Sequence, residues 1–189
     1  MFTRRQMLVG AAVLPLAGVA LADDTPQARN RRMLFQRLRL AATEREGRRA
    51  EDAVWRMWMD AAPTPEVAEA VAEAMRRRER YDWDKALEIL DGVVADAPGY
   101  AEGWNQRAFI RFLKQDFDGA LEDIERALAL EPLHFAALAG RATILMQQGR
   151  IEPGQAALRR AVEIHPWLKE RSMLIPRPGE TPPGREKEI

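Results

Sequence analysis

The sequence predicts an all-α fold, a short α-solenoid of about three helix-turn-helix units, with an N-terminal helical hairpin and a short C-terminal capping helix. Three observations support it. Prolines recur every 34 residues in the second half of the chain, apolar residues recur at intervals of three or four, and small residues return at fixed places between them. Apolar spacing of this kind marks one face of an α-helix, and a period of 34 residues suits a pair of helices.

Composition excludes several classes of protein. The chain has 189 residues, with 29 Lys and Arg against 29 Asp and Glu, so it is not a uniformly basic nucleic-acid binder. Without cysteine it has no disulfide, thiolate metal site or thiol nucleophile. Charged residues make up 31%, which is typical of a soluble globular body.

Residues 1–22 are predicted to be a signal peptide cleaved after Ala22. Arg4 and Arg5 precede sixteen uncharged residues, 7–22, and residues 20–22 follow the small-x-small cleavage rule. The run is slightly short for a membrane-spanning helix, although a retained anchor is the alternative. We therefore expect an exported, periplasmic protein. Arg4 and Arg5 also resemble a twin-arginine motif, so the Sec and twin-arginine routes both stay open.

Residues 23–65 are predicted to form a helical hairpin. One apolar stripe runs through Leu34, Phe35, Leu38 and Ala42, and the second through Glu51, Val54, Trp55, Trp58 and Met59. We expect the break between the helices near Gly47, and a joint to the repeats at residues 63–65. Because the end of a solenoid exposes its core, the hairpin is interpreted as a cap.

Residues 66–174 form the predicted repeat domain, with repeats at 67–100, 101–134 and 135–168. Each repeat ends two residues after its proline; these prolines are Pro98, Pro132 and Pro166. Small residues at the eighth and twentieth positions let two helices approach; they are Ala74, Ala108, Ala142, Ala86, Ala120 and Gly154. The proline stops the second helix, because it lacks an N–H and pushes its predecessor out of the α region.

Three stretches carry a family resemblance: Trp104-Asn105-Gln106-Arg107-Ala108, then Asp116-Phe117-Asp118-Gly119-Ala120-Leu121, then Ala127-Leu128-Ala129-Leu130-Glu131-Pro132. With them the chain resembles the tetratricopeptide repeat (TPR) family, in particular small exported bacterial members. Repeat three agrees well. Repeat one departs, with Glu73 and Arg77 at usually apolar sites, and Arg107 and Arg141 replace a usual leucine. The resemblance implies a right-handed superhelix of helix pairs, a concave face that binds partners, and no enzymatic activity.

Residues 167–189 are predicted to form a short helix followed by a tail. Trp167, Leu168 and Leu174 are expected to form a short final helix that closes repeat three. Residues 175–189 contain four prolines and two glycines among alternating charges, so we expect a disordered or extended tail.

No catalytic, cofactor-binding or metal-binding residue is expected. Ser172 is the single serine and lies in no nucleophile motif, and no glycine-rich phosphate loop is present. His134 and His165 are the only histidines, and no third ligand accompanies them in a metal-binding pattern. We therefore expect no enzyme, no cofactor and no small-molecule substrate.

The candidate partner-binding groove comes from the resemblance. In the family, fixed positions of the first helix of each repeat face the concave side. Carried onto repeats two and three, these positions give Glu102, Asn105, Phe109, Phe112 and Leu113, then Ala136, Ala139, Thr143, Met146 and Gln147. The family's carboxylate clamp needs Lys, Asn and Arg at several of them, and only Asn105 matches. The expected groove is therefore apolar, and the residues predicted to bind the partner are Asn105, Phe109, Phe112, Thr143 and Met146.

Two occupants of that groove stay open. Either a protein or peptide segment binds there, with the Asn105 amide donating to and accepting from its backbone, or the hairpin or the tail folds back and fills it. The first interpretation makes the chain a non-enzymatic TPR adaptor or scaffold for protein–protein interaction in the periplasm or cell envelope.

Charge suggests an alternative function. Residues 27–50 hold eight Arg and two Glu, whereas residues 66–131 hold nine basic and sixteen acidic residues. The basic N-terminal helix, from Arg29 to Arg49, would let a membrane-peripheral envelope assembly factor contact anionic lipid. The simpler interpretation is a solvated helix face that pairs with the acidic middle of the chain. Nucleic acid is not an expected partner, because the basic stretch has no aromatic platform beyond Phe35.

Overall fold

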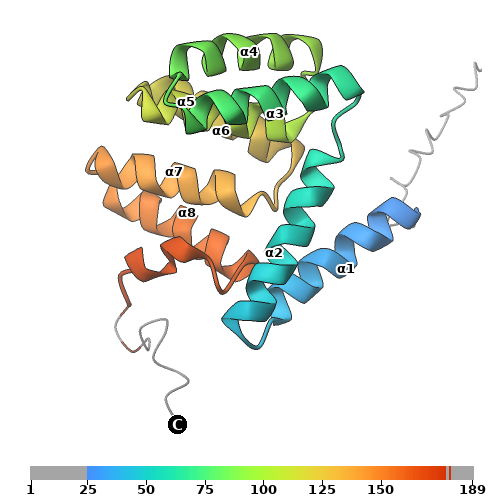
Figure 1. Cartoon of the computed structure of the whole chain (residues 1–189). Helices are drawn as coiled ribbons and strands as arrows, with labels where there is room; N and C mark the ends of the chain where they lie inside the picture. Colours follow the sequence, from blue (N-terminus) through green and yellow to red (C-terminus); the bar gives the residue numbers. More distant parts are fainter. Residues whose placement is uncertain (1–24, 178, 180–189) are drawn as a thin grey trace, which may run out of the picture.

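A computed structural model describes residues 25–177 and 179 of the chain. These residues form eight α-helices and one 3₁₀ helix, which confirms the all-α prediction (Figure 1). The elements are α1 (Pro26–Leu40), α2 (Glu44–Met59), α3 (Pro65–Glu79), α4 (Trp83–Asp96), α5 (Ala101–Leu113), α6 (Phe117–Leu130), α7 (Phe135–Gln147), α8 (Ile151–Ile164) and η1 (Lys169–Met173). The predicted signal peptide lies outside the described residues.

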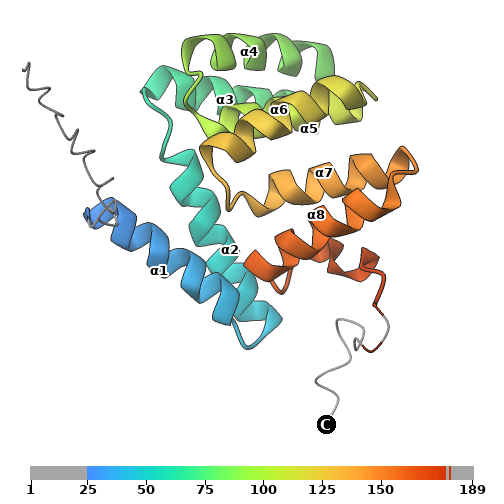
Figure 2. The same cartoon turned by 180° about the vertical axis from the view of Figure 1, so that it is seen from behind.

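The pairs α3–α4, α5–α6 and α7–α8 are the three predicted repeats, stacked in chain order (Figures 1 and 2). The second helix of each pair ends two residues before the repeat proline, at Asp96, Leu130 and Ile164. Helix α6 begins where its sequence indicates, since the Asp116 carboxylate accepts from the Gly119 N–H at 3.1 Å.

Small residues set the distance between the helices of a pair. Ala86, Ala120 and Ala142 are buried without residual exposure. A Cβ added to Gly154 would lie 2.6 Å from Met146 Cγ and 3.1 Å from the Ala142 carbonyl oxygen. Repeat three therefore needs glycine at this position, because α8 approaches α7 too closely for any side chain.

The N-terminal hairpin forms, but its turn differs from the expected one. Helix α1 ends at Leu40 and α2 begins after Thr43, whose hydroxyl accepts from the Glu46 N–H at 3.3 Å. Gly47 is buried in the first turn of α2. A Cβ there would lie 2.8 Å from Trp167 Cβ, so this glycine marks a close contact with the chain after α8 and not a break.

The hairpin packs mainly on repeat three, and its last residue, Met59, also packs against the core of the neighbouring repeat one. Its buried side chains share one core with α7, α8 and the residue before η1; this core includes Phe35, Leu38, Val54, Trp58, Phe135, Leu138, Leu158, Ile164 and Leu168. Helix α2 runs from the start of α3 along the side of the array towards α8 (Figures 1 and 2). At its far end the Trp167 indole N–H donates to the Ala41 carbonyl at 2.8 Å. The hairpin thus covers apolar surface, as a cap does, but at the opposite end of the array.

Repeat one has polar side chains where the hairpin is missing. Glu73 and Arg77, the two departures from the family pattern, pair at 2.6 Å, and Arg77 also pairs with Asp82 at 3.1 Å. Arg76 pairs with Glu73 and Glu69 on the same helix. Because no described helix covers this face of α3, charged residues suit it better than the usual apolar ones.

The chain after α8 returns along that helix. Leu168 is buried in the core of repeat three, and η1 follows it as the expected short final helix. Ile175, the first residue of the predicted tail, donates its N–H to Gln155 Oε1 at 2.8 Å and accepts from Arg159 at 2.6 Å. Most of the tail, residues 178 and 180–189, lies outside the described residues. No helix within the described ranges is long and apolar enough to cross a membrane.

Candidate functional site

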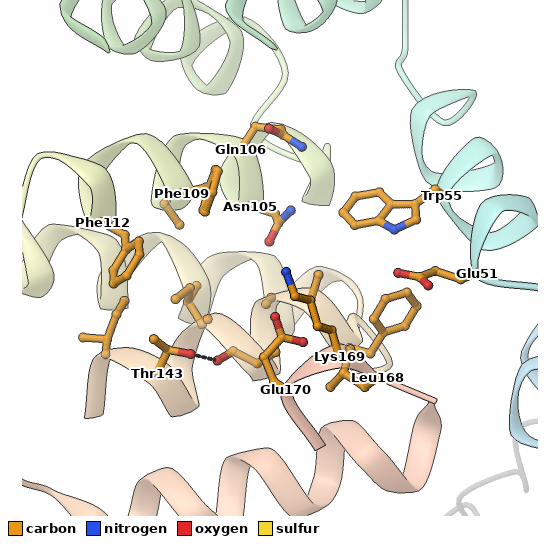
Figure 3. A pocket seen from close by; sticks show the side chains of 18 of the residues that line it. Glu51, Trp55, Asn105, Gln106, Phe109, Phe112, Thr143, Leu168, Lys169 and Glu170 are labelled. Carbon is orange, nitrogen blue, oxygen red and sulfur yellow. Dashed lines mark hydrogen bonds between the residues drawn. The ribbon is translucent and has the colours of Figure 1, made fainter. Parts of the chain in front are cut away.

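A cavity of about 460 Å³ lies between α2, α5, α7 and the start of η1. Figure 3 shows aromatic and polar side chains from these elements around it. Its lining is mainly apolar, with a few charged and amide groups; it includes Trp55, Asn105, Phe109, Phe112, Ile124, Phe135, Ile144, Leu168, Arg78 and Lys169. This mixture is typical of a binding pocket.

Four of the five predicted groove residues line the cavity. Asn105, Phe109 and Phe112 come from α5 and Thr143 comes from α7. The helical period explains this placement, because positions three or four residues apart share one face of α5. The Thr143 hydroxyl donates to the Ala139 carbonyl at 3.0 Å within its own helix, so it has already used its donor.

The prediction for the fifth groove residue, Met146, differs from the structure. Met146 does not line the cavity; its side chain lies between α7 and α8, where its Sδ is 3.1 Å from Gln155 Nε2. The missing side chain of Gly154 leaves room there, and a flexible thioether fills it. The carry-over from the family placed Met146 on the concave face, whereas local packing in repeat three turns it away.

The mouth of the cavity presents aromatic surface. Phe109 is 43% exposed, and its ring stacks beside that of Phe112 with centroids 6.3 Å apart. The Arg78 guanidinium lies 5.2 Å from the Phe109 centroid and donates to Gln106 Oε1 at 3.1 Å. A partly exposed aromatic pair beside a cation can bind an apolar side chain and a nearby acidic group.

Asn105 can offer its side-chain carbonyl oxygen to a ligand as a hydrogen-bond acceptor. Its amide nitrogen lies 3.3 Å from a carboxylate oxygen of Glu102, which leaves the side-chain carbonyl without a donor among the described residues. Glu102 is buried and also accepts from Gln106 at 2.5 Å. The predicted dual role of the Asn105 amide is therefore reduced to that of an acceptor.

Sequence reasoning missed the polar centre below Asn105. His134 Nε2 lies 2.9 Å from Glu102 Oε2, and both side chains are completely buried. The His134 ring stacks on Trp58 of α2, with centroids 3.9 Å apart and 13° between the planes. Both histidines are thus part of the packing between repeats and hairpin, which gives them a structural role.

Helix α2 forms one wall of the cavity. Trp55 meets Phe135 edge to face at 6.2 Å, and Glu51 Oε2 lies 3.2 Å from His165 Nε2. The hydrogen bond from His165, followed by that from Arg48, holds the pKa of Glu51 below its usual range. Of the two occupants expected for the concave side, the hairpin is therefore present, but it leaves the cavity beside it.

Tyr100 joins α2 to α5, two of the helices around the cavity, and cations line the cavity itself. Burial raises the pKa of Tyr100, whose hydroxyl donates to the Met59 carbonyl at 3.4 Å and attaches the end of α2 to the start of α5. Arg78 and Lys169, which line the cavity, form no ion pair with any carboxylate in the described part of the chain. Glu170 also lines the cavity and forms no ion pair within the described residues, so the unpaired groups carry one positive charge in excess.

The histidines and the serine lie apart from one another in the described part of the chain. Within residues 25–177 and 179, no group of three or more His, Asp or Glu side chains could hold a metal ion. Each histidine faces one carboxylate, and the single serine, Ser172, donates to the Lys169 carbonyl on η1.

Comparison with known proteins supports the repeat assignment. Residues 111–166 match a family model described as a tetratricopeptide repeat. A TPR repeat-containing protein of Rhizobium etli is 41% identical over 81 residues, which is 43% of this chain. The match spans 40% of that relative's length.

Solved structures share the fold at low identity. The first TPR of Spaghetti (RPAP3), bound to an HSP90 peptide, has a TM-score of 0.54 and 18% identity, covering 55% of this chain and 82% of its own. The Sgt2 TPR domain of Aspergillus fumigatus gives 0.52 and 21%, with 55% and 68% covered. The TPR2B domain of yeast Sti1, in its pHsp70 complex, gives 0.52 and 22%, with 53% and 81% covered.

Proposed function

Because the helix pairs of this chain are tetratricopeptide repeats, we propose that the protein is a non-enzymatic adaptor that binds a protein or peptide segment through the concave cavity. The observation that carries the proposal is the aromatic pair Phe109 and Phe112, which lines a cavity together with Arg78 and Lys169 and of which Phe109 is 43% exposed. Exposed aromatic surface of this kind in a chain usually marks a contact. The solved TPR domains of Spaghetti and Sti1, which are bound to an HSP90 peptide and to pHsp70, support a peptide as the ligand.

The compartment is part of the proposal. Arg4, Arg5, the uncharged run 7–22 and the small residues before Asp23 support export to the periplasm or cell envelope. Partners are therefore sought in the envelope fraction of the cell that makes this protein.

The experiment compares two alanine variants of equal exposure. Phe109 and Leu130 are both 43% exposed, but only Phe109 lines the cavity. We expect Phe109→Ala to weaken binding of a partner captured from the envelope fraction about tenfold or more, since truncated aromatic anchors commonly cost this much. Leu130→Ala should leave binding unchanged. Equal binding by wild type and Phe109→Ala in a titration would reject the cavity as the partner site.

A second candidate function is supported by the outer face of α1. Met33 is 51% exposed and Leu40 is 69% exposed, two helical turns apart, and Arg37 lies between them. A surface groove of about 560 Å³ between α1 and α2 adds Arg49. Apolar and basic residues together on one helix face suit anionic lipid. Arg31 is not part of this surface, because it pairs with Glu131 at 3.0 Å.

Sedimentation with phosphatidylglycerol vesicles tests this second function. Arg37→Gln with Arg49→Gln should reduce pelleting at low salt, whereas Arg150→Gln, which removes one exposed charge at the start of α8, should not. Raising the salt concentration should release the wild type, because surface charges are screened. A wild type that stays in the supernatant at low salt would end the lipid proposal.

A further inference from the structure

We propose that α2 takes the place of the natural partner in this structure: the concave side binds an acidic amphipathic helix with two aromatic residues three or four positions apart, and the hairpin α1–α2 swings out to admit it. This inference rests on the proposed adaptor function and specifies the ligand.

Helix α2 lies where a ligand of the concave side would lie. Ala136 and Ala139, two of the positions expected on that side, pack into the core that the hairpin shares with repeat three. Trp55 lines the cavity together with Phe109 and Phe112 of α5. One element therefore covers the inner surface of repeat three and reaches the open aromatic pair of repeat two.

The contacting side chains of α2 follow the pattern of a helix bound in a groove. Glu51, Val54, Trp55 and Trp58 lie at intervals of three or four and meet the repeats with one face. Trp58 stacks on His134, and Trp55 packs edge to face on Phe135. Anchors at i, i+3 or i+4, and i+7 are how amphipathic helices bind apolar grooves. The groove is thus already shaped for a helix with two aromatic anchors.

The contact between hairpin and repeats is imperfect in its polar groups. Within the described residues, the buried indole N–H of Trp58 has no acceptor. The buried Nδ1 atom of His165 has no hydrogen-bond partner either. An unsatisfied buried polar atom costs free energy. Release of α2 returns the Trp58 N–H to water, so this atom favours exchange of one helix for another, although release also breaks the contact between Glu51 and His165.

A short exposed connection joins the hairpin to the repeats and would serve as the hinge. Residues 60–64 join α2 to α3, are mostly exposed, and contain Pro63. Helix α1 packs on α2 and moves with it, and its contacts with the repeats, such as Arg31 with Glu131, break in the same movement. Hinges of a few exposed residues between helices absorb such rotations.

The charge of the cavity indicates the charge of the partner. Arg78 and Lys169 line it without a carboxylate partner in the described part of the chain. Two carboxylates also line it: Glu51, which His165 and Arg48 already engage, and Glu170, so the unpaired groups carry one positive charge in excess. A partner helix with further acidic residues would pair with these two cations, as complementary charges do across interfaces.

The test uses the full chain and a fluorescent peptide with the α2 sequence, residues 43–60, as the probe. Trp58→Ala in the chain weakens the internal contact and should raise affinity for the peptide at least about tenfold, because a site competes less with its own occupant. The matched control peptide has alanine at both tryptophan positions and should not bind. Equal peptide affinity of wild type and Trp58→Ala would overturn the inference.

A disulfide keeps the test independent of any folding defect in Trp58→Ala. The chain has no cysteine, and the Cβ position at residue 47 lies 2.8 Å from Trp167 Cβ, so a small separation of the backbones accommodates Gly47→Cys with Trp167→Cys. Oxidation should lock the hairpin and abolish peptide binding, and reductant should restore it. Peptide binding that is unaffected by oxidation would contradict displacement.

Two further outcomes separate this inference from the adaptor function. If Phe109→Ala weakens a captured partner while the α2 peptide neither binds nor competes, the adaptor function stands and the helix inference fails. If Trp58→Ala forms dimers that the α2 peptide dissociates, a second copy supplies α2 to the same surface, which supports the inference. Light scattering after size-exclusion chromatography detects such dimers.

Discussion

The indole of Trp58 lies flat against the imidazole of His134, with ring centroids 3.9 Å apart. His134 in turn lies 2.9 Å from Glu102 of α5. These two contacts join the hairpin to the start of α7 and the start of α7 to α5, through side chains that are almost completely buried.

Trp58→Ala should lower the free energy of unfolding by about 3–5 kcal/mol, the usual cost of truncating a buried aromatic side chain. Urea denaturation followed by circular dichroism measures it. Trp58→Phe is the matched control, since it keeps a stacking ring and removes the unsatisfied indole N–H; its loss should stay below about 1.5 kcal/mol. Equal losses in the two variants would mean that ring stacking does not hold the hairpin.

Arg107→Leu should destabilise the protein although leucine is the usual family residue at this position. Arg107 donates to both oxygens of Asp123, at 2.9 and 2.6 Å, and the Asp123 side chain is 2% exposed. Leucine would leave that carboxylate buried with only Arg111 nearby, at 3.3 Å. We expect a loss of about 3 kcal/mol in chemical denaturation.

The double variant Arg107→Leu with Asp123→Ala is the control for this effect. It removes the buried charge together with its partner, so most of the loss should be recovered. A double variant less stable than Arg107→Leu would show that the carboxylate is stabilised in another way.

Gly47→Ala and Gly92→Ala should change stability in opposite directions. A Cβ at residue 47 would lie 2.7 Å from Trp167 Cδ1, so the hairpin must shift, at a cost of about 1–3 kcal/mol. Gly92 lies inside α4, and a Cβ there meets nothing within 4 Å. Alanine should stabilise that helix by up to about 1 kcal/mol. Melting temperatures of the two variants test both signs, and a stabilised Gly47→Ala would refute the close contact.

Acid should weaken the contact of the hairpin through Glu51. The pKa of this carboxyl is lowered in the folded protein, because it accepts hydrogen bonds from His165 and Arg48. A carboxyl with a lowered pKa stabilises the fold above its unfolded pKa of about 4.3 and loses that contribution as the pH falls through the folded value.

Urea denaturation of wild type and Glu51→Gln at pH 7 and at pH 3 measures this contribution. The wild type should exceed the variant at pH 7, and the difference should shrink at pH 3. A difference that grows towards low pH would contradict the assigned role.

The order of helices was predictable because it depends on local signals. Asp82 and Asp116 stand directly before α4 and α6, and a proline follows each second helix after two residues. The side of α5 that carries Asn105, Phe109 and Phe112 follows from the same helical period. These features need no knowledge of which helices meet.

The position of the hairpin was not predictable in this way. Its contacts join residues about 100 or more apart in the sequence, such as Arg31 with Glu131 and Ala41 with Trp167. An apolar stripe states that a helix is buried but not against which surface. Gly47 illustrates the difficulty, because a glycine needed for a distant tryptophan has the same appearance as one that ends a helix.

The contact of the hairpin with repeat three also affects how the chain acquires its structure. In an open array each repeat depends only on its neighbours, so ends fray and parts unfold independently. Here the first helices made are among the last to reach their place, because their core partners in α7, α8 and Leu168 follow a hundred residues later. We expect a slow docking step after the repeats have formed, and a single unfolding transition once docking is complete. Because the hairpin and repeat three share one core, a destabilising substitution in either of them should destabilise both.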